Sequence, residues 1–210
     1  RRSRRQSPPD GGASGDKGRP MAGSLKGQLL LAGRQLRDPN FFRSVVLMVE
    51  HDAQGAMGLV LNRPGQARVS GALGEERDDV PPIHDLLFEG GPVEPQALFV
   101  VHQIVRLRKG CTTVLPKVYL GGGQDAFEDF LSWLSTHRTS SGPYRVFNGC
   151  SGWGPGQLDR ELKRGDWMLL PATSEHVFQA DPYSLWEHCV EEFMARNPAL
   201  KGGGGNWRWN

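Results

Sequence analysis

Long apolar runs are absent from this sequence of 210 residues. Runs such as LLLA and VVLMV have the length of single strands, far below the roughly 20 apolar residues of a membrane-spanning helix. We therefore expect a protein that does not enter a membrane. Cysteine is also scarce: Cys111, Cys150 and Cys189 are odd in number, widely spaced and without a CxxC pair. This pattern excludes a disulfide framework and predicts a reducing, cytoplasmic location.

A strong positive charge is missing from the part of the chain that should fold. The net charge is +2 at pH 7, but residues 1–20 carry six basic and two acidic side chains, so the remainder has a net charge of −2. A mildly acidic domain does not predict a broad nucleic-acid surface. We expect nucleic acid to be a partner only through residues 1–20.

Residues 1–20 also lack large apolar side chains and are rich in Arg, Gly, Ser and Pro. Such a segment cannot bury enough surface to order itself, and it has no apolar core of a secretory signal. We predict a disordered tail over 1–26, one domain over 27–198 and a flexible tail over 199–210. Two interpretations of the first tail stay open: Met21 is the true start, or the basic residues form an arm that contacts RNA or DNA.

Short apolar segments predict about seven or eight strands, most of them ahead of the helices. The segments SVVLMVEHD (44–52) and MGLVLNRP (57–64) are separated by a short glycine-containing loop, which predicts a hairpin whose second strand ends at Pro64. Residues 65–83 have few apolar side chains and many glycines and charges. They are predicted to be a mobile loop, and the sequence assigns them no role.

Three helices are expected. Residues 124–138 place apolar side chains at helical spacing on one face. A second helix should have Pro155 near its first position and stop at Gly165, and a third should have Asp181 as N-cap and Pro182 at the first helical position. Strands that come first and helices that come late favour an α+β fold over regular βαβ winding.

The stretch FNGCSGWGPGQLDREL (147–162) is the main catalytic candidate. A strand, a glycine-rich turn and a helix can present a nucleophile, but the Gly-x-Ser-x-Gly elbow fails because Trp153 stands at the second glycine position. Cys150, activated by a helix N-terminus and a histidine, would make the protein a small hydrolase or transferase. The alternative is that the glycines only permit a sharp turn under Trp153, with Pro155 starting the helix.

Signals for cofactors are weak. The stretch YLGGGQDAF matches G-x-G-x-x-A, but Asp125 in the first helical turn would repel a phosphate. No cofactor is therefore expected. No metal is expected either, because the candidate ligands share no ligand spacing: His51, Asp52, His84, Asp85 and His102.

Three blocks in the same order resemble the AlgH/YqgE family of bacterial and plastid proteins. They are GQLLLAGRQLRDPNFFRSVVLMVEHDAQGAMGLVLNRP, then EGGPV, then FNGCSGWGPGQLDREL followed by DW, within roughly residues 27–195. The resemblance implies a single α+β domain, with a bifurcated, mostly antiparallel β-sheet forming a pseudo-barrel and about three flanking helices. The family carries the label of transcriptional regulators but has no established activity, cofactor or catalytic residues. Nothing in this chain resembles a helix-turn-helix.

The family pattern at the main motif is Gly-Tyr-Ala-Gly-Trp, where this chain has Cys150 and Ser151. The resemblance therefore implies that both are substitutions in a turn. Our leading hypothesis is a non-enzymatic binding or regulatory protein with an unknown protein or small-molecule partner. The alternatives are an enzyme that uses Cys150 and nucleic-acid binding through residues 1–20. The predicted binding residues lie in the family blocks and are polar or amphipathic: Arg43, Glu50, His51, Asn62, Arg63, Trp153 and Gln157.

Overall fold

This computed structural model describes residues 23–33, 36–69, 85–137, 142–178 and 180–201. Its strands are β1 (Gln28–Ala32), β2 (Val45–Asp52), β3 (Gly55–Val60), β4 (Pro64–Arg68), β5 (Leu86–Glu89), β6 (Val93–His102), β7 (Thr112–Leu115), β8 (Val118–Gly122), β9 (Tyr144–Trp153) and β10 (Trp167–Pro171). Its α-helices are α1 (Gln124–Thr136), α2 (Gln157–Arg164), α3 (Ser174–Phe178) and α4 (Leu185–Arg196). Short 3-10 turns are η1 (Pro39–Phe41), η3 (Val105–Leu107) and η4 (Pro198–Lys201).

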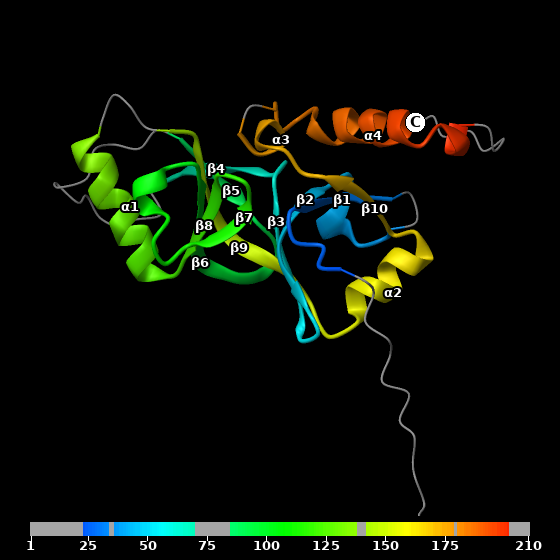
Figure 1. Ribbon diagram of the computed structural model, residues 1–210, viewed down its shortest axis with the longest axis horizontal. Coiled ribbons are helices and arrows are strands. Elements are labelled where there is room, and N and C mark those ends of the chain that lie inside the picture. The colour runs from blue at the N-terminus through cyan, green and yellow to red at the C-terminus, as the bar shows by residue number, and fades with distance from the viewer. Residues whose placement is uncertain (1–22, 34–35, 70–84, 138–141, 179, 202–210) are drawn as a thin grey trace, which may run out of the picture.

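The sheet divides at β9. The strand order is β10-β1-β2-β3-β9-β6-β8-β7, with β4 and β5 beside this path. The last residues of β9 pair with β3, whereas its first part pairs with β6 and, in parallel, with β5. All other pairings are antiparallel, and β7 returns close to β2. The fold is the single α+β domain with a bifurcated, pseudo-barrel sheet that the resemblance implied (Figure 1).

Alternation along β1 and β2 explains why helices cover both faces of this part of the sheet. In β1, Leu29 and Leu31 join the cluster that includes the buried face of α4, while Leu30 joins the cluster that includes Leu158 of α2. β2 repeats the pattern with Leu47 on the α4 side. In Figure 1, α4 lies above these strands and α2 below them. The remaining long helix, α1, packs on the other part of the sheet through its predicted apolar face: Phe127, Phe130, Leu131 and Leu134.

The predicted β2–β3 hairpin is confirmed, but the position of Pro64 was wrong. The strand ends at Val60, and Pro64 begins β4, where it pairs with Phe88 of β5. Proline is compatible with the first residue of a strand, where its missing N–H need not enter the ladder. The predicted loop over 65–83 therefore begins as a strand, and its residues 70–83 lie outside the described residues.

The interpretation of 147–162 as strand, glycine turn and helix was wrong in its boundaries. β9 continues through the glycines to Trp153, and the turn follows at 154–156. A Cβ at Gly149, which has φ +65°, would lie 2.5 Å from the carbonyl oxygen of Gly91. Glycine is thus needed there for the close approach of two backbones rather than for a turn. α2 then begins at Gln157 after a left-handed Gly156, two residues later than Pro155 suggested.

The last helix also begins later than predicted. Its N-cap position is Ser184, and the Asp181 carboxylate accepts the backbone N–H of Ser184 at 3.1 Å. Asp181 therefore closes a turn ahead of the helix instead of capping the helix itself. The prediction also missed the five-residue α3 and counted fewer strands than the ten found among the described residues. Elements this short contain too few residues to show a clear periodicity.

No helix among the described residues is long and apolar enough to span a membrane. Of the predicted tails, residues 1–22 and 202–210 lie outside the described part of the chain.

Candidate functional site

A groove of about 810 Å³ lies between the tip of the β2–β3 hairpin and the turn that joins β9 to α2. His51 and Asp52 line it from the hairpin, and 154–156 line it from the turn. The first turns of α2 contribute Asp159 and Arg160. The groove exists because Ala56 of β3 pairs with Trp153 of β9, which sets the hairpin tip beside the β9–α2 turn.

A partly buried hydrogen-bond network fixes the floor beneath this turn. The indole N–H groups of Trp153 and Trp167 both donate to Oε2 of Glu161, at 2.9 and 2.8 Å. The other oxygen, Oε1, accepts from Nε2 of Gln157 at 2.9 Å, and Oε1 of Gln157 accepts the N–H of Gly154 at 3.1 Å. Trp153 and Gln157, both predicted as binding residues, thus lie under the turn and hold its shape.

His51 is the one predicted binding residue that lines the groove itself. Its Nδ1 accepts the backbone N–H of Leu25 at 3.0 Å, and its carbonyl accepts the hydroxyl of Ser24 at 2.9 Å. Because Nδ1 accepts, the proton of the neutral ring is on Nε2. These contacts hold the chain at residues 23–25 along one edge of the groove.

Asp159 is the unusual residue of the groove. Its Oδ1 is buried and accepts no hydrogen bond from the described residues. A buried acceptor without a partner costs about 1–3 kcal/mol, and more when it is charged. The second groove carboxylate, Asp52, does have a partner, since its Oδ1 accepts the N–H of Gln54 at 2.7 Å. The guanidinium of Arg160 lies near Gly156, so both signs of charge line the groove.

Three other predicted residues lie at the opposite end of β2. Asn62 accepts the N–H of Val45 at 2.9 Å and donates to the carbonyl of Arg43 at 2.8 Å. Arg63 donates to the carbonyl of Phe42. Along an eight-residue strand the two ends are roughly 20 Å apart. Arg43, Asn62 and Arg63 therefore do not share a surface with His51.

Arg43 has a further contact with α4. Its Nη1 lies 3.2 Å from Oε1 of Glu187, and its guanidinium carbon lies 5.3 Å from the ring centroid of Trp186. Arg43 also has a positive φ of 50°. The remaining predicted residue, Glu50, is exposed on β2, and its charge acts on Cys150.

Cys150 does not have the environment of a nucleophile. The side chain is 5% exposed and belongs to the central hydrophobic cluster. Burial, with the charges of Glu94 and Glu50, raises the pKa of its thiol and so disfavours the reactive thiolate. Ser151 is fully buried, and its hydroxyl donates to the carbonyl of Gly90 at 3.1 Å.

A second thiol, Cys111, lies beside a histidine that the sequence did not connect with it. Its Sγ is 3.6 Å from Nε2 of His102 and donates to the carbonyl of Leu107 at 3.0 Å. Burial lowers the pKa of His102 to about 4, and burial raises the pKa of Cys111, with Asp129 adding to the rise. Both groups are held neutral, so this pair lacks the thiolate–imidazolium character of a catalytic dyad.

Asp159 and Arg160 are the groove residues that the sequence prediction missed. Both follow the glycine turn directly, but only the pairing of β3 with β9 brings them to the hairpin tip. Their helical position alone looks like an ordinary charged first turn.

Known proteins share this fold and much of this sequence. Residues 29–197 match the AlgH-like family (DUF179). A UPF0301 protein of Myxococcus xanthus is 40% identical over 176 residues, covering 82% of this chain and 92% of its own length. A UPF0301 protein of Chlorobaculum tepidum is 34% identical over 183 residues, covering 84% of this chain and 94% of its own length. The solution structure of the AlgH protein from Pseudomonas aeruginosa superposes with a TM-score of 0.65 at 28% identity, over 90% of this chain and 99% of that one.

Proposed function

The chain belongs to the AlgH-like family, and on that premise we propose that it is a non-enzymatic binding protein whose ligand lies in the groove between the β2–β3 hairpin tip and the β9–α2 turn. The observation that carries the proposal is the buried, unpartnered Oδ1 of Asp159 in a groove of about 810 Å³. Small-molecule sites measure roughly 300–1,000 Å³ and place few polar groups in a largely apolar lining.

The charges of the groove restrict the chemistry of the ligand. Asp159 calls for a donor, either a cation or an N–H group, because its buried oxygen accepts nothing from the described residues. Arg160 supplies donors only, so it calls for an oxygen acceptor. The ligand class that meets both demands is a small polar molecule with an amine or amide N–H at one position and a carbonyl or carboxylate at another.

Glycines in the turn support the same proposal. Gly154 and Gly156 are exposed and line the groove, so no side chain covers the backbone there. A ligand can therefore approach the main chain closely, which is a common use of glycine at binding sites. The network around Glu161 keeps this backbone in place before the ligand arrives, which reduces the ordering cost of binding.

A binding role without catalysis is supported by the thiol chemistry. Burial raises the pKa of Cys150, and the neutral His102 beside Cys111 has no charge with which to stabilise a thiolate. The three free cysteines suit a reducing compartment, so we place the protein in the cytoplasm as part of the same proposal.

A fragment screen by nuclear magnetic resonance tests the proposal. The 15N-labelled protein is exposed to small amines, amides, guanidines and amino acids, and shifted amides are mapped. We expect perturbations to cluster at 51–56 and 154–160. Cationic fragments should bind about 10-fold more weakly to Asp159→Asn, a loss that corresponds to one charge-assisted hydrogen bond.

The matched control is Asp125→Asn, which changes an exposed aspartate at the corresponding first turn of α1. This variant should bind every fragment as the parent does. Hits spread over the surface, or equal weakening by both variants, would remove the support for a site in the groove.

A further inference from the structure

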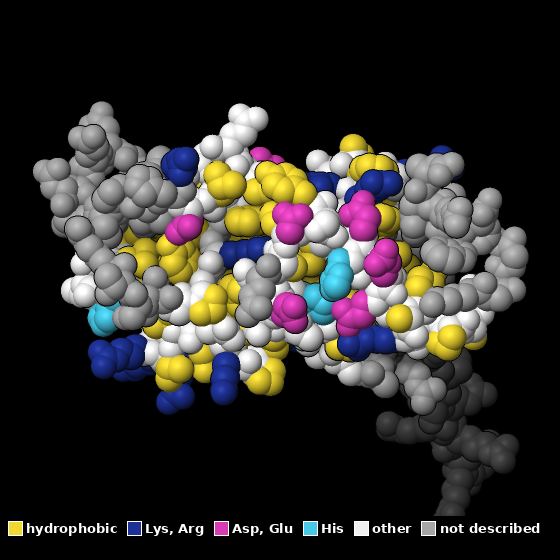
Figure 2. Space-filling view, turned by 90° about the horizontal axis from the view of Figure 1, so that it is seen from above, with side chains coloured by type: hydrophobic (Ala, Val, Ile, Leu, Met, Phe, Trp, Pro, Cys, Tyr) yellow, Lys and Arg dark blue, Asp and Glu magenta, His cyan; other side chains and the backbone are white. Residues whose placement is uncertain are grey.

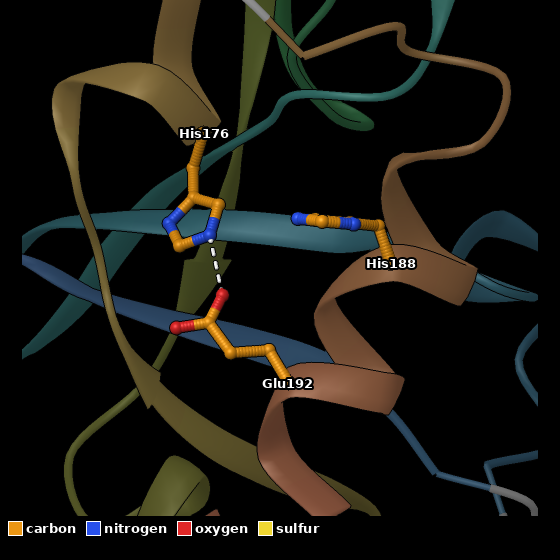
Figure 3. A group of neighbouring side chains, drawn as sticks. All are labelled: His176, His188 and Glu192. Carbon is orange, nitrogen blue, oxygen red and sulfur yellow. Dashed lines mark hydrogen bonds and ion pairs between the residues drawn. The ribbon is translucent and has the colours of Figure 1, made fainter. Parts of the chain in front are cut away.

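Three side chains from two helices converge on the face of the molecule opposite the groove. His176 comes from α3, and His188 and Glu192 come from successive turns of α4 (Figure 3). Their nitrogen and oxygen atoms lie within 4.8 Å of one another. Nε2 of His176 is 2.9 Å from Oε2 of Glu192, and the two imidazole centroids are 6.5 Å apart.

We propose that His176, His188 and Glu192 bind a divalent transition-metal ion, with zinc as the preferred ion. Two imidazoles and one carboxylate form a donor set that suits zinc, whereas calcium and magnesium require mostly oxygen ligands. The site is independent of the groove, because α4 and α2 pack on opposite faces of the sheet.

The distances require little rearrangement. Ligand atoms on a tetrahedral zinc with bonds of about 2.0–2.1 Å are separated by roughly 3.3 Å. The His176–Glu192 pair already has nearly this spacing at 2.9 Å. His188 must move closer to the other two ligands, and its exposed imidazole can do so by a change of rotamer that does not disturb the core. The i, i+4 spacing of His188 and Glu192 keeps both on the same side of α4.

Neighbouring groups orient two of the three ligands, as partners of metal ligands commonly do. Arg196 bonds to Oε1 of Glu192, which leaves Oε2 directed at His176. On His176, Nδ1 accepts the N–H of Thr173 and also lies 3.1 Å from its hydroxyl oxygen. Without metal, the Nε2 proton therefore points to Glu192. With metal on Nε2, the proton moves to Nδ1, which then gives up the bond from the Thr173 backbone N–H and donates to the Thr173 hydroxyl instead.

The local charge also favours a cation. α3 and α4 carry the acidic residues Glu175 and Glu191 in addition to Glu192, while Glu187 is paired with Arg43. Figure 2 shows histidine side chains on this face with Asp and Glu side chains gathered around them. Such a surface concentrates dications near the three ligands. Since three protein ligands leave one tetrahedral position free and His188 is exposed, we expect a water or an external carboxylate to complete the site.

Zinc titration of the full chain in a Cys111→Ser background tests the site, because that background removes the partly exposed thiol. We expect one zinc per chain, and we expect His188→Ala to bind zinc about 100-fold more weakly. Loss of a residue that only contacts a metal ligand already lowers metal affinity by up to about 100-fold, and His188 is proposed as a ligand itself. This variant leaves the His176–Glu192 contact intact, so its fold should persist. The matched control is His137→Ala at the C-cap of α1, which should bind zinc as the parent does.

Two further readouts separate a metal site from a plain ion pair. Cobalt should give the visible absorption of a four- or five-coordinate ion in the parent and not in His188→Ala. Imidazole 15N spectra should show the His176 proton moving from Nε2 to Nδ1 when zinc is added. The proposal is overturned if the parent fails to bind zinc, if His188→Ala binds it equally well, or if the His176 tautomer stays unchanged.

Discussion

The two ends of β2 use similar polar residues in different ways. At one end, Asn62 and Arg63 bond to backbone atoms of the chain at 42–45; we call this the pinned end. At the other, His51 and Asp52 face Asp159 and its neighbours across open space; we call this the groove end. Both ends contain polar side chains of the family blocks, so residue type does not separate them.

Hydrogen-bond partners do separate them. At the pinned end the amide of Asn62 has both a donor and an acceptor from the backbone, which leaves it little capacity for a ligand. At the groove end a carboxylate oxygen has none among the described residues. The hydroxyl of Ser44, near the pinned end, is also buried without a partner, but it is neutral and fully enclosed rather than part of a groove. Both oxygens are buried, but of the two residues Asp159 alone lines a groove.

Asn62→Ala should produce the largest loss of stability. It leaves the N–H of Val45 and the carbonyl of Arg43 without their side-chain partners, at a cost of about 2–4 kcal/mol. Urea unfolding measures the change, and fragment binding in the groove should stay as in the parent. Asn40→Ala, at an exposed position, should change the unfolding free energy by less than about 0.5 kcal/mol. Loss of fragment binding in Asn62→Ala would contradict the claim that only the groove end binds a ligand.

Glu161→Ala should affect both stability and binding. Two indole N–H groups and the amide of Gln157 lose their acceptor, which should cost about 2–3 kcal/mol. The turn at 154–156 then loses its support, so groove fragments should bind more weakly although none touches Glu161. Glu128→Ala, on the exposed face of α1, is the control. If Glu161→Ala lost fragment binding but kept its stability, or lost stability but kept fragment binding, the network around Glu161 would not link the two properties.

Arg63→Ala should have a small effect. Its bond to the carbonyl of Phe42 is exposed, and exposed contacts of this kind are worth less than about 1 kcal/mol. Thermal unfolding should show a slight decrease in Tm, and groove binding should not change. A marked loss of fragment binding would place the ligand at the pinned end instead.

Iodoacetamide labelling examines β9, the strand that carries both the groove turn and the thiol of the enzymatic alternative. At neutral pH we expect Cys150 to stay unlabelled in the folded chain, because it is 5% exposed and its thiol pKa is raised. The partly exposed Cys111 should react first, and all three cysteines should react in urea. Rapid labelling of Cys150 would revive the interpretation as a thiol enzyme.

Elements with strong local signals were predicted well from the sequence. The apolar spacing of 127–134 identified α1, and the family blocks implied the divided sheet. The glycines of β9 misled the prediction because a strand rich in glycine looks like a turn until its close neighbour is known. That neighbour, the backbone at Gly91, comes from 58 positions earlier in the chain.

The candidate sites were predicted less well for the same reason. His51 was selected, but Asp159 becomes interesting only when the fold places a buried oxygen beside a groove. At the proposed metal site, the i, i+4 spacing of His188 and Glu192 is visible in the sequence, whereas the third ligand depends on how α3 docks against α4. Local sequence patterns predict helices and strands, but the sites form through contacts between segments that are distant in the sequence.

The comparison of Asp159→Asn with Asn62→Ala in one fragment titration tests the central claim most directly. We predict that the free energy of unfolding of Asp159→Asn lies within about 1 kcal/mol of the parent value, since removal of an unpartnered buried carboxylate oxygen offsets the lost interaction with the start of α2. It should nevertheless bind cationic groove fragments about 10-fold more weakly. Asn62→Ala should be destabilised and bind them normally. The opposite pattern, with binding lost only in Asn62→Ala, would contradict the account.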